Sequence, residues 1–153
     1  MKKLIFSVLF VALAFGAQAQ RKGEAQKPEG YKITDKDCVE VTPVKDQSRS
    51  GTCWSFSGTA FLESEILKNG GEVVDLSEMW IVRHCYEQKA EKFVRLHGML
   101  NFGQGGATHD VMNAIEEFGI VPEEVYRGLN YGSEKHNHYE VDALLRHSFQ
   151  VSI

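Results

Sequence analysis

Residues 46–64 read DQSRSGTCWSFSGTAFLES, a glycine-bearing turn that runs into an apolar stretch of helical period, with Cys53 at the junction. Beyond the cysteine, large apolar residues recur at the spacing of one helix face, which predicts a helix over 53–68 that is buried on that face. The sequence Asn69-Gly70-Gly71 predicts its end, because glycine adopts the left-handed backbone conformation found there. The apolar residues of the expected buried face are Trp54, Phe61, Leu62 and Ile66.

Cys53 has four possible roles: a small buried hydrophobe, half of a disulfide, a metal ligand or a nucleophile. A helix N-terminus offers unpaired N–H groups and a partial positive charge, and both stabilise the thiolate, which is the reactive form of cysteine. Gly51 lets the backbone turn sharply beside the thiol, and Gln47 supplies a side-chain amide that can donate a hydrogen bond. Acyl transfer needs such donors for the oxygen that becomes negative, and the backbone N–H of Cys53 is a second one. These features alone leave a structural role for Cys53 open.

The rest of the chain shows further helical patterns. A second helix is expected to begin after Ser77, whose side chain can cap it. A third is expected after a cap at Thr108 or Asp110 and before Gly119, and a last one over 139–149. The chain is therefore predicted to be mostly helical with long connections, which often carry sites. Apolar residues expected in the core are Met79, Trp80, Val82, Tyr86, Phe93, Val111, Met112, Ile115 and Phe118.

Residues 1–19 have the pattern of a secretory signal peptide: a basic start, an apolar run and the small-x-small site Ala17-Gln18-Ala19. The run is shorter than the roughly 20 residues that span a bilayer, so an uncleaved anchor is the less favoured alternative. Residues 20–40 are mostly polar and predict an arm or linker, and residues 41–153 form the remaining unit. The mature chain is expected to be periplasmic or secreted, with no membrane attachment after cleavage.

Charge and cysteine content exclude several classes of function. The 153 residues include 17 basic and 21 acidic ones, a formal charge of −4, which makes binding to nucleic acid a poor expectation. Three cysteines leave at least one thiol without an internal partner, and whether Cys38 pairs with Cys85 after export stays open. No C-x-x-C motif occurs, so a zinc ribbon lacks its defining feature. No metal or other cofactor is expected.

Residues 42–56, TPVKDQSRSGTCWSF, resemble the nucleophile segment of papain-like cysteine peptidases: a Pro-Val pair, a glutamine six residues before the cysteine, and Cys-Trp-x-Phe. Three further stretches resemble motifs of that family in the correct order, namely LSE at 76–78, GQGGA at 103–107 and GIVPEEVY at 119–126. The resemblance covers roughly residues 41–131.

The resemblance implies an α+β papain-like cysteine peptidase fold, of which this chain is the mostly α-helical nucleophile lobe, and a peptide substrate. It implies that Cys53 is the nucleophile and that Gln47 contributes to the oxyanion hole. Gly105 and Gly106 would let a peptide backbone approach closely, and Trp54 would shield the site. Equally, the two glycines can simply form a turn and Trp54 can pack in the core.

Two departures from the usual papain-like pattern occur together. Typical members have a cysteine three residues before the nucleophile that pairs with a cysteine in the glycine loop, whereas this chain has Ser50 and Gly103 there. With RSGTCW at 49–54 and VYRGLNYG at 125–132, the chain resembles the bleomycin hydrolase and aminopeptidase C branch. That resemblance implies removal of amino acids from peptide N-termini and assembly into a homo-oligomer, a hexamer. Its usual cytosolic location contrasts with the expected signal peptide.

In the family a histidine shares a proton with the cysteine, an asparagine orients that histidine, and both come from a second lobe. Neither motif occurs after Cys53, so the chain is expected to be a truncated lobe, inactive alone, whose partner is the second lobe of the same enzyme. Glu63 and Glu65 are expected to be surface charges, and His136 and His138 to be solvated in a polar loop. No catalytic role is expected for any histidine: His84, His97, His109, His136, His138 or His147.

Two other functions fit parts of the sequence. A naturally short chain of this kind can be a non-catalytic module that holds a peptide or a partner protein in an open cleft. The coding sequence past Ile153 separates this alternative from the enzyme. A redox or metal protein that uses Cys38, Cys53 and Cys85 is the weaker alternative, and metal analysis tests it.

Overall fold

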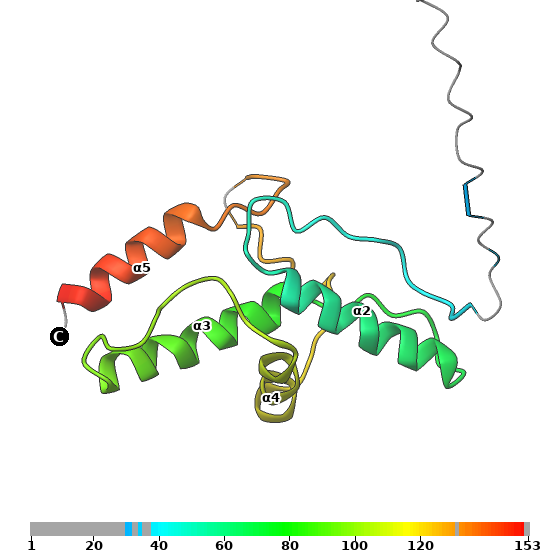
Figure 1. Ribbon diagram of the computed structural model, residues 1–153, viewed down its shortest axis with the longest axis horizontal. Coiled ribbons are helices and arrows are strands. Elements are labelled where there is room, and N and C mark those ends of the chain that lie inside the picture. The colour runs from blue at the N-terminus through cyan, green and yellow to red at the C-terminus, as the bar shows by residue number, and fades with distance from the viewer. Residues whose placement is uncertain (1–29, 32–33, 35–37, 131, 152–153) are drawn as a thin grey trace, which may run out of the picture. The chain divides into compact units, whose positions relative to one another are not determined.

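The computed structural model describes residues 30–31, 34, 38–130 and 132–151. The expected signal peptide and most of the expected arm lie outside the described residues. Of the described residues, those from Cys38 onward belong to one unit that contains four helices (Figure 1). They are α2, Cys53–Lys68; α3, Glu78–Arg95; α4, Thr108–Phe118; and α5, Tyr139–Val151. None of these helices is long and apolar enough to cross a membrane.

Helix α2 begins and ends where the sequence predicts. Cys53 is its first residue, Asn69 caps its C-terminus, and Gly70 adopts a φ of 80° in the left-handed region. The expected buried face is partly wrong, because Phe61 is 59% exposed and Ile66 is 36% exposed. The buried side instead carries Trp54 together with small and polar residues: Ser55, Gly58, Thr59 and Glu63.

Small residues face inward on α2 because α4 lies very close to it. A Cβ added to Gly58 would lie 2.8 Å from the nearest methyl carbon of Val111 on α4. Helix α4 also packs against α3, and Figure 1 shows it nearly end-on below the junction of α2 and α3. The core formed by these three helices consists of Trp54, Met79, Ile81, Val82, Cys85, Val111 and Ala114.

The caps of α3 and α4 decide where those helices begin. Ser77 caps α3 as predicted, since its Oγ accepts a hydrogen bond from the N–H of Trp80 at 3.1 Å. The expected cap of α4 is partly right: the N-cap residue is Ala107, not Thr108 or Asp110, but the Asp110 carboxylate caps the helix by accepting from the Ala107 N–H at 2.8 Å. Gly119 ends α4 as predicted, with a φ of 74°.

Helix α5 begins at Tyr139 as predicted and packs against α3. Phe149 of α5 is in aromatic contact with Phe93 of α3 and with Phe102, with ring centroids 6.5 and 5.4 Å apart. Extended pairing among the described residues is limited to two isolated bridges, Arg49 with Asn137 and Leu76 with Pro122. The fold is thus a small helical assembly in which long connections are tied down by short pairings.

Candidate active site

The turn that leads into α2, residues 46–52, is called the Cys53 turn below. It is stabilised internally, because Asp46 Oδ1 accepts a hydrogen bond from the Ser48 N–H at 2.8 Å. Ser48 itself has a φ of 53°, which is uncommon for a residue with a side chain. Ser50 Oγ donates to the backbone oxygen of Gln47 at 2.8 Å, which closes the turn below the cysteine.

Cys53 is exposed at the first position of α2. The N-cap residue Thr52 makes no side-chain hydrogen bond to the helix, and the first turn contains no acidic residue. The free N–H groups and the positive end of the helix dipole are therefore not neutralised by a neighbouring carboxylate of α2. An exposed thiol at such an end is accessible to an electrophile.

Gln47 and Cys53 line the same hollow, which has a volume of about 470 Å³ and lies along the start of α2. The structure therefore brings together the two residues that the sequence assigned to attack and to oxyanion binding. Gln47 Oε1 is buried and has no hydrogen-bond partner among the described residues. Other residues that line the hollow include Pro43, Val44, Phe56 and Ala60.

The glycine loop, residues 103–107, lies beside the Cys53 turn. The Oε1 of Gln104 accepts a hydrogen bond from the Gly51 N–H at 2.6 Å, and the Gln104 backbone oxygen accepts from the indole N–H of Trp54 at 3.0 Å. Trp54 is buried in the core. A Cβ on Gly106 would lie 2.5 Å from the Trp54 ring, whereas a Cβ on Gly105 would meet nothing within 4 Å. Of the three candidate substrate-binding residues, only Gly105 thus has open space beside its Cα.

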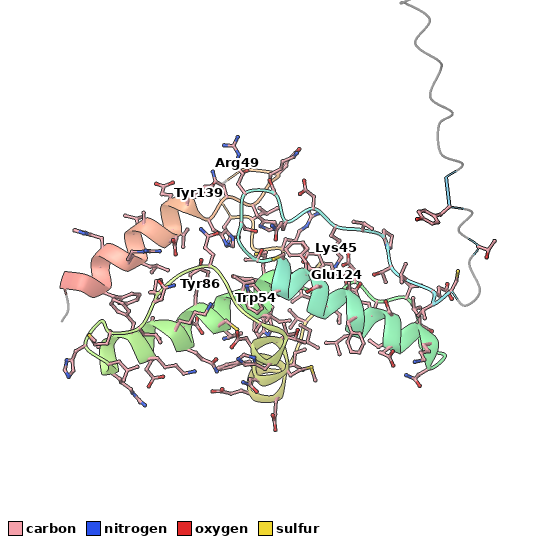
Figure 2. The ribbon with its side chains drawn as sticks, viewed as in Figure 1. Lys45, Arg49, Trp54, Tyr86, Glu124 and Tyr139 are labelled. Carbon is pink, nitrogen blue, oxygen red and sulfur yellow. The ribbon has the colours of Figure 1, made fainter. Side chains whose placement is uncertain are left out.

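Lys89 of α3 holds the same loop from the other side, which the sequence did not predict. Its ammonium donates to the backbone oxygens of Gly103, at 3.2 Å, and of Gly105. It also lies 5.6 Å from the centroid of the Trp54 ring and 5.9 Å from that of Tyr86. Figure 2 labels these two aromatic residues. Such contacts between an ammonium and aromatic faces are attractive. A lone lysine on a helix carries no sequence signal for such a role.

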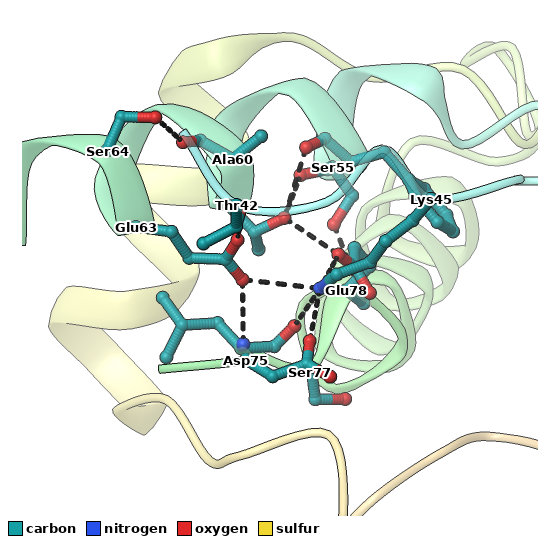
Figure 3. Close-up of polar contacts among 12 residues, drawn as sticks. Thr42, Lys45, Ser55, Ala60, Glu63, Ser64, Asp75, Ser77 and Glu78 are labelled. Carbon is teal, nitrogen blue, oxygen red and sulfur yellow. Dashed lines mark hydrogen bonds and ion pairs between the residues drawn. The ribbon is translucent and has the colours of Figure 1, made fainter. Parts of the chain in front are cut away.

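A partly buried ionic cluster joins the segment before the Cys53 turn to α2 and α3. Figure 3 shows Lys45 between Glu63, Asp75 and Glu78, at nitrogen–oxygen distances of 3.2, 2.5 and 2.6 Å. The prediction of Glu63 as a surface charge is wrong, because its side chain is 0% exposed. Two further hydrogen bonds satisfy the Glu63 carboxylate, from Thr42 Oγ1 at 2.5 Å and from the Leu76 N–H at 2.8 Å.

The charge of Lys45 is strongly favoured within this cluster. Partial burial lowers the pKa of Lys45, but hydrogen bonds to Asp75 and Glu78 and the charge of Glu63 outweigh it, so that the net pKa is raised. The ammonium also donates to the Leu76 backbone oxygen at 3.2 Å. A lysine with so many acceptors fixes the segment that leads to the Cys53 turn.

The loop with two histidines pairs with the Cys53 turn, contrary to its expected place in solvent. The Arg49 N–H donates to the His136 backbone oxygen at 3.0 Å, and the His138 N–H donates to the Arg49 backbone oxygen at 3.2 Å. Both Nδ1 atoms are buried without a partner among the described residues. Burial lowers the pKa of His136 and of His138, and the neighbouring His136 lowers that of His138 further. Burial therefore favours the neutral form of both imidazoles, against the opposing charges of Glu78 and Asp142.

The other four histidines have contacts or surroundings that do not include the Cys53 thiol. His109 is 75% exposed in its side chain and lies 3.4 Å from Asp110. His84 stacks on Phe118 at the edge of the core, with ring centroids 4.1 Å apart. His97 and His147 are exposed. None of these contacts involves Cys53.

The remaining cysteines differ in environment. Cys38 is exposed and Cys85 is buried, and neither forms a disulfide in the structure. Burial raises the pKa of the Cys85 thiol to about 11, and the charge of Asp110 adds to this effect. Among the described residues, no group of three or more metal-ligating side chains is close enough together to hold a metal ion.

Comparisons with known proteins agree with the motifs. Residues 27–150 match the family described as papain family cysteine protease. The probable cysteine protease RD19B of Arabidopsis thaliana is 32% identical over 133 residues, which cover 82% of this chain and 34% of that protein. Procathepsin L of Rattus norvegicus is 36% identical over 63 residues, 41% of this chain and 18% of that protein.

A cathepsin L-like peptidase of Aedes aegypti is 52% identical over 42 residues, which cover 28% of this chain and 12% of that protein. The matches thus span at most about a third of the length of these curated relatives. The matches confirm the predicted resemblance to papain-like cysteine peptidases. Membership of the bleomycin hydrolase and aminopeptidase C branch stays a prediction. Because the family match extends over most of its residues, this chain belongs to the papain family of cysteine proteases.

Proposed function

We propose that this chain is the nucleophile-bearing part of a cysteine peptidase that cleaves peptide bonds through an acyl-enzyme. The observation that carries the proposal is the exposed Cys53 thiol at the start of α2, in one hollow with Gln47. The thiolate attacks the carbonyl carbon of the scissile peptide bond, and a tetrahedral intermediate with a negative oxygen forms. The side-chain amide of Gln47 and the backbone N–H of Cys53 donate hydrogen bonds to that oxygen.

Collapse of the intermediate breaks the carbon–nitrogen bond and leaves the acyl group on Cys53. The leaving amine takes a proton from a histidine, which we assign to a second lobe of the same enzyme, together with the asparagine that orients it. Water then attacks the thioester, which releases the acid product and restores the thiol. The limited share of the relatives' length that this chain spans supports a second lobe as its partner, and without it the chain is inactive.

The glycine loop is the proposed contact for the substrate backbone. Open space beside Gly105 favours close approach of a peptide there, whereas Trp54 and Gly106 support the loop from beneath. Removal of N-terminal amino acids is the proposed specificity. It is supported by the motifs RSGTCW and VYRGLNYG and by the absence of the cysteine pair at Ser50 and Gly103. We also propose a hexameric assembly, from the same resemblance, and export directed by residues 1–19.

The nucleophile is tested by substitution in the enzyme extended through the second lobe. Cys53→Ala is expected to lower peptidase activity to background, and Cys38→Ala, which removes another exposed thiol, is the matched control. Gln47→Ala is expected to lower kcat about 10²-fold or more, as loss of one oxyanion-hole donor does. Full activity of Cys53→Ala would refute the proposal. Peptides with free and acetylated N-termini separate aminopeptidase from internal cleavage.

A further inference from the structure

Gln104 makes two hydrogen bonds on either side of Cys53. Its side-chain Oε1 accepts from the Gly51 N–H at 2.6 Å, two residues before the thiol. Its backbone oxygen accepts from the indole N–H of Trp54 at 3.0 Å, one residue after the thiol. One residue of the glycine loop thus binds both the turn that enters α2 and the first turn of the helix itself.

The Gln104 side chain is packed as well as hydrogen-bonded. A Cβ added to Gly51 would lie 3.0 Å from Gln104 Cβ and 3.3 Å from its Oε1, so the absence of a side chain at position 51 makes room for the carboxamide. The backbone on either side of Gln104 is held by the Lys89 ammonium, through the oxygens of Gly103 and Gly105. The acceptor that meets Gly51 is therefore presented from a fixed loop.

The cysteine pair expected from the family resemblance would join the same two segments. Ser50 and Gly103 occupy its positions, and no covalent link between the segments exists here. Ser50 Oγ instead bonds within the turn, to the Gln47 backbone oxygen at 2.8 Å and with Thr52 Oγ1 at 2.5 Å. Between the described residues of the glycine loop and the turn, the side-chain hydrogen bond is the one that Gln104 accepts from Gly51.

We propose that Gln104 is a positioning residue for Cys53, and that its hydrogen bond to Gly51 fixes the thiol at the helix end in place of a disulfide. The proposal rests on the proposed role of Cys53 as nucleophile. When the bond is lost, the turn and the first turn of α2 become mobile, and the thiolate loses its fixed relation to the free helix N–H groups. Unlike a disulfide, this hydrogen bond is not broken by reducing agents.

Two variants of this chain isolate the hydrogen bond from the size of the side chain. Gln104→Met has a similar length but no strong acceptor, and Gln104→Glu keeps an acceptor oxygen at the same reach. The first measurement is hydrogen exchange at the Gly51 amide by NMR. The second is the rate of alkylation of Cys53 by iodoacetamide, followed by mass spectrometry of the peptides.

The other two cysteines act as internal references in the labelling experiment. Exposed Cys38 reports the reactivity of an ordinary thiol, and buried Cys85 reports loss of the fold, since it reacts only when the core opens. Labelling is done at a temperature at which Cys85 stays protected in every variant. A destabilised variant is then still compared while it is folded.

In Gln104→Met we expect faster exchange at Gly51 and about fivefold slower labelling of Cys53, the effect of losing one ordinary hydrogen bond. Gln104→Glu is expected to restore both towards wild type. Unchanged Cys53 labelling in Gln104→Met, or equal slowing in both variants, would overturn the positioning role while the nucleophile assignment stands. Cys53 that reacts no faster than Cys38 in the unaltered chain would instead contradict the proposed function.

Discussion

Cys53 and Cys85 show how the surroundings of a residue decide what its thiol can do. Cys53 is exposed at a helix N-terminus, where amide groups face it. Cys85 lies in the core, and its Sγ donates only a weak hydrogen bond to the Asp110 backbone oxygen at 3.7 Å. Burial raises the pKa of Cys85 to about 11, so this thiol stays protonated and inert at neutral pH. The sequence correctly placed Cys53 at a helix start, because helix-start signals are local, and its role as nucleophile stays a prediction.

Gly106 is predicted to be intolerant of any side chain, whereas Gly105 is predicted to tolerate one. Gly106→Ala would bring a methyl group to 2.5 Å from the Trp54 ring, and we expect a loss of about 1–3 kcal/mol in the free energy of unfolding, as in other overpacked cores. Gly105→Ala is the matched control, because its Cβ meets nothing within 4 Å. Urea unfolding of both variants measures the difference.

An equal loss of stability in Gly105→Ala and Gly106→Ala would contradict this prediction. It would show that the backbone conformation of the loop, and not the contact with Trp54, requires glycine. The sequence could not separate these two glycines, since adjacent glycines have the same local signal. The difference arises from Trp54, which lies about 50 residues away along the chain and meets Gly106 only in the folded structure. Glu63 shows the same limit, because the partners that bury it, Thr42 and Lys45, lie 21 and 18 residues away.

At the scale of elements, helix ends were predictable and helix faces were only partly so. Gly70 and Gly119 have positive φ angles, and Ser77 accepts from the helix it caps, as their residue types predict. The buried side of α2 depends instead on how closely α4 approaches it, which is a tertiary property. Phe61 and Ile66 are therefore 59% and 36% exposed although their spacing is that of a buried stripe.

The contact between α2 and α4 predicts a compensating pair of substitutions. Gly58→Ala places a Cβ 2.8 Å from a Val111 methyl carbon, so we expect it to lower the free energy of unfolding by about 1–3 kcal/mol. Val111→Ala alone is expected to be destabilising too, because it leaves a small cavity. In the double variant the alanine at 58 occupies part of the space that the valine vacates, so its loss should be smaller than the sum of the single losses.

A double-mutant cycle measured by urea unfolding gives the coupling between these two positions. Additive losses would mean that α4 shifts away from α2 when Gly58 is replaced. The cycle thus tests the geometry of the helix pair, independently of any proposal about catalysis. Ala60→Gly, at an exposed position of the same helix, controls for the intrinsic cost of glycine and alanine exchanges.

At the scale of the whole molecule, the Lys45 cluster joins three separate parts of the described chain. It links the segment before the Cys53 turn, the middle of α2 and the start of α3 (Figure 3). Lys45→Met leaves the carboxylates of Glu63 and Glu78, which are 0% and 4% exposed, without their shared cation. We expect a loss of about 3–5 kcal/mol in the free energy of unfolding, as for other broken buried ion pairs.

Lys68→Met is the matched control. Within the described part of the chain Lys68 pairs with Glu65 alone, at the surface, so its removal should change stability by less than about 1 kcal/mol. Adding Glu63→Gln to Lys45→Met should recover part of the loss, since it removes one uncompensated charge. Similar stabilities for Lys45→Met and Lys68→Met would show that solvent reaches the cluster. The labelling rate of Cys53 in the same variants shows whether the cluster also orders the turn.

The long-range arrangement of the candidate site could be predicted from sequence only in part. The family resemblance implied that Gln47 and Cys53 act together, and both residues line one hollow. The pairing of Arg49 with the loop of His136 and His138 was missed, because an isolated bridge between polar segments has no periodic pattern. The role of Lys89 was missed as well, because its hydrogen-bond partners are backbone oxygens, which are present whatever the residue type.

Glu123 makes the stability of the molecule depend on pH near neutrality. Burial, together with the charges of Glu78 and Asp75, raises the pKa of its carboxyl to about 7 against the opposing effects of Lys45 and Arg127. Between the ordinary value of 4.5 and this value, the folded state binds more protons at Glu123 than the unfolded state does. The free energy of unfolding therefore falls as pH rises through this window.

Glu123→Gln removes this titration while it keeps the size of the side chain. The difference in the free energy of unfolding between the variant and wild type should grow in favour of the variant by about 1 kcal/mol from pH 5 to pH 8, a discounted value because the carboxyl is only partly buried. Urea unfolding at both pH values measures it, and the comparison with wild type cancels the other titrating groups. A constant difference would mean that Glu123 titrates as a solvated carboxyl. The pairing of residues 121–123 with 75–77, which holds it against the Lys45 cluster, would then be looser than in this structure.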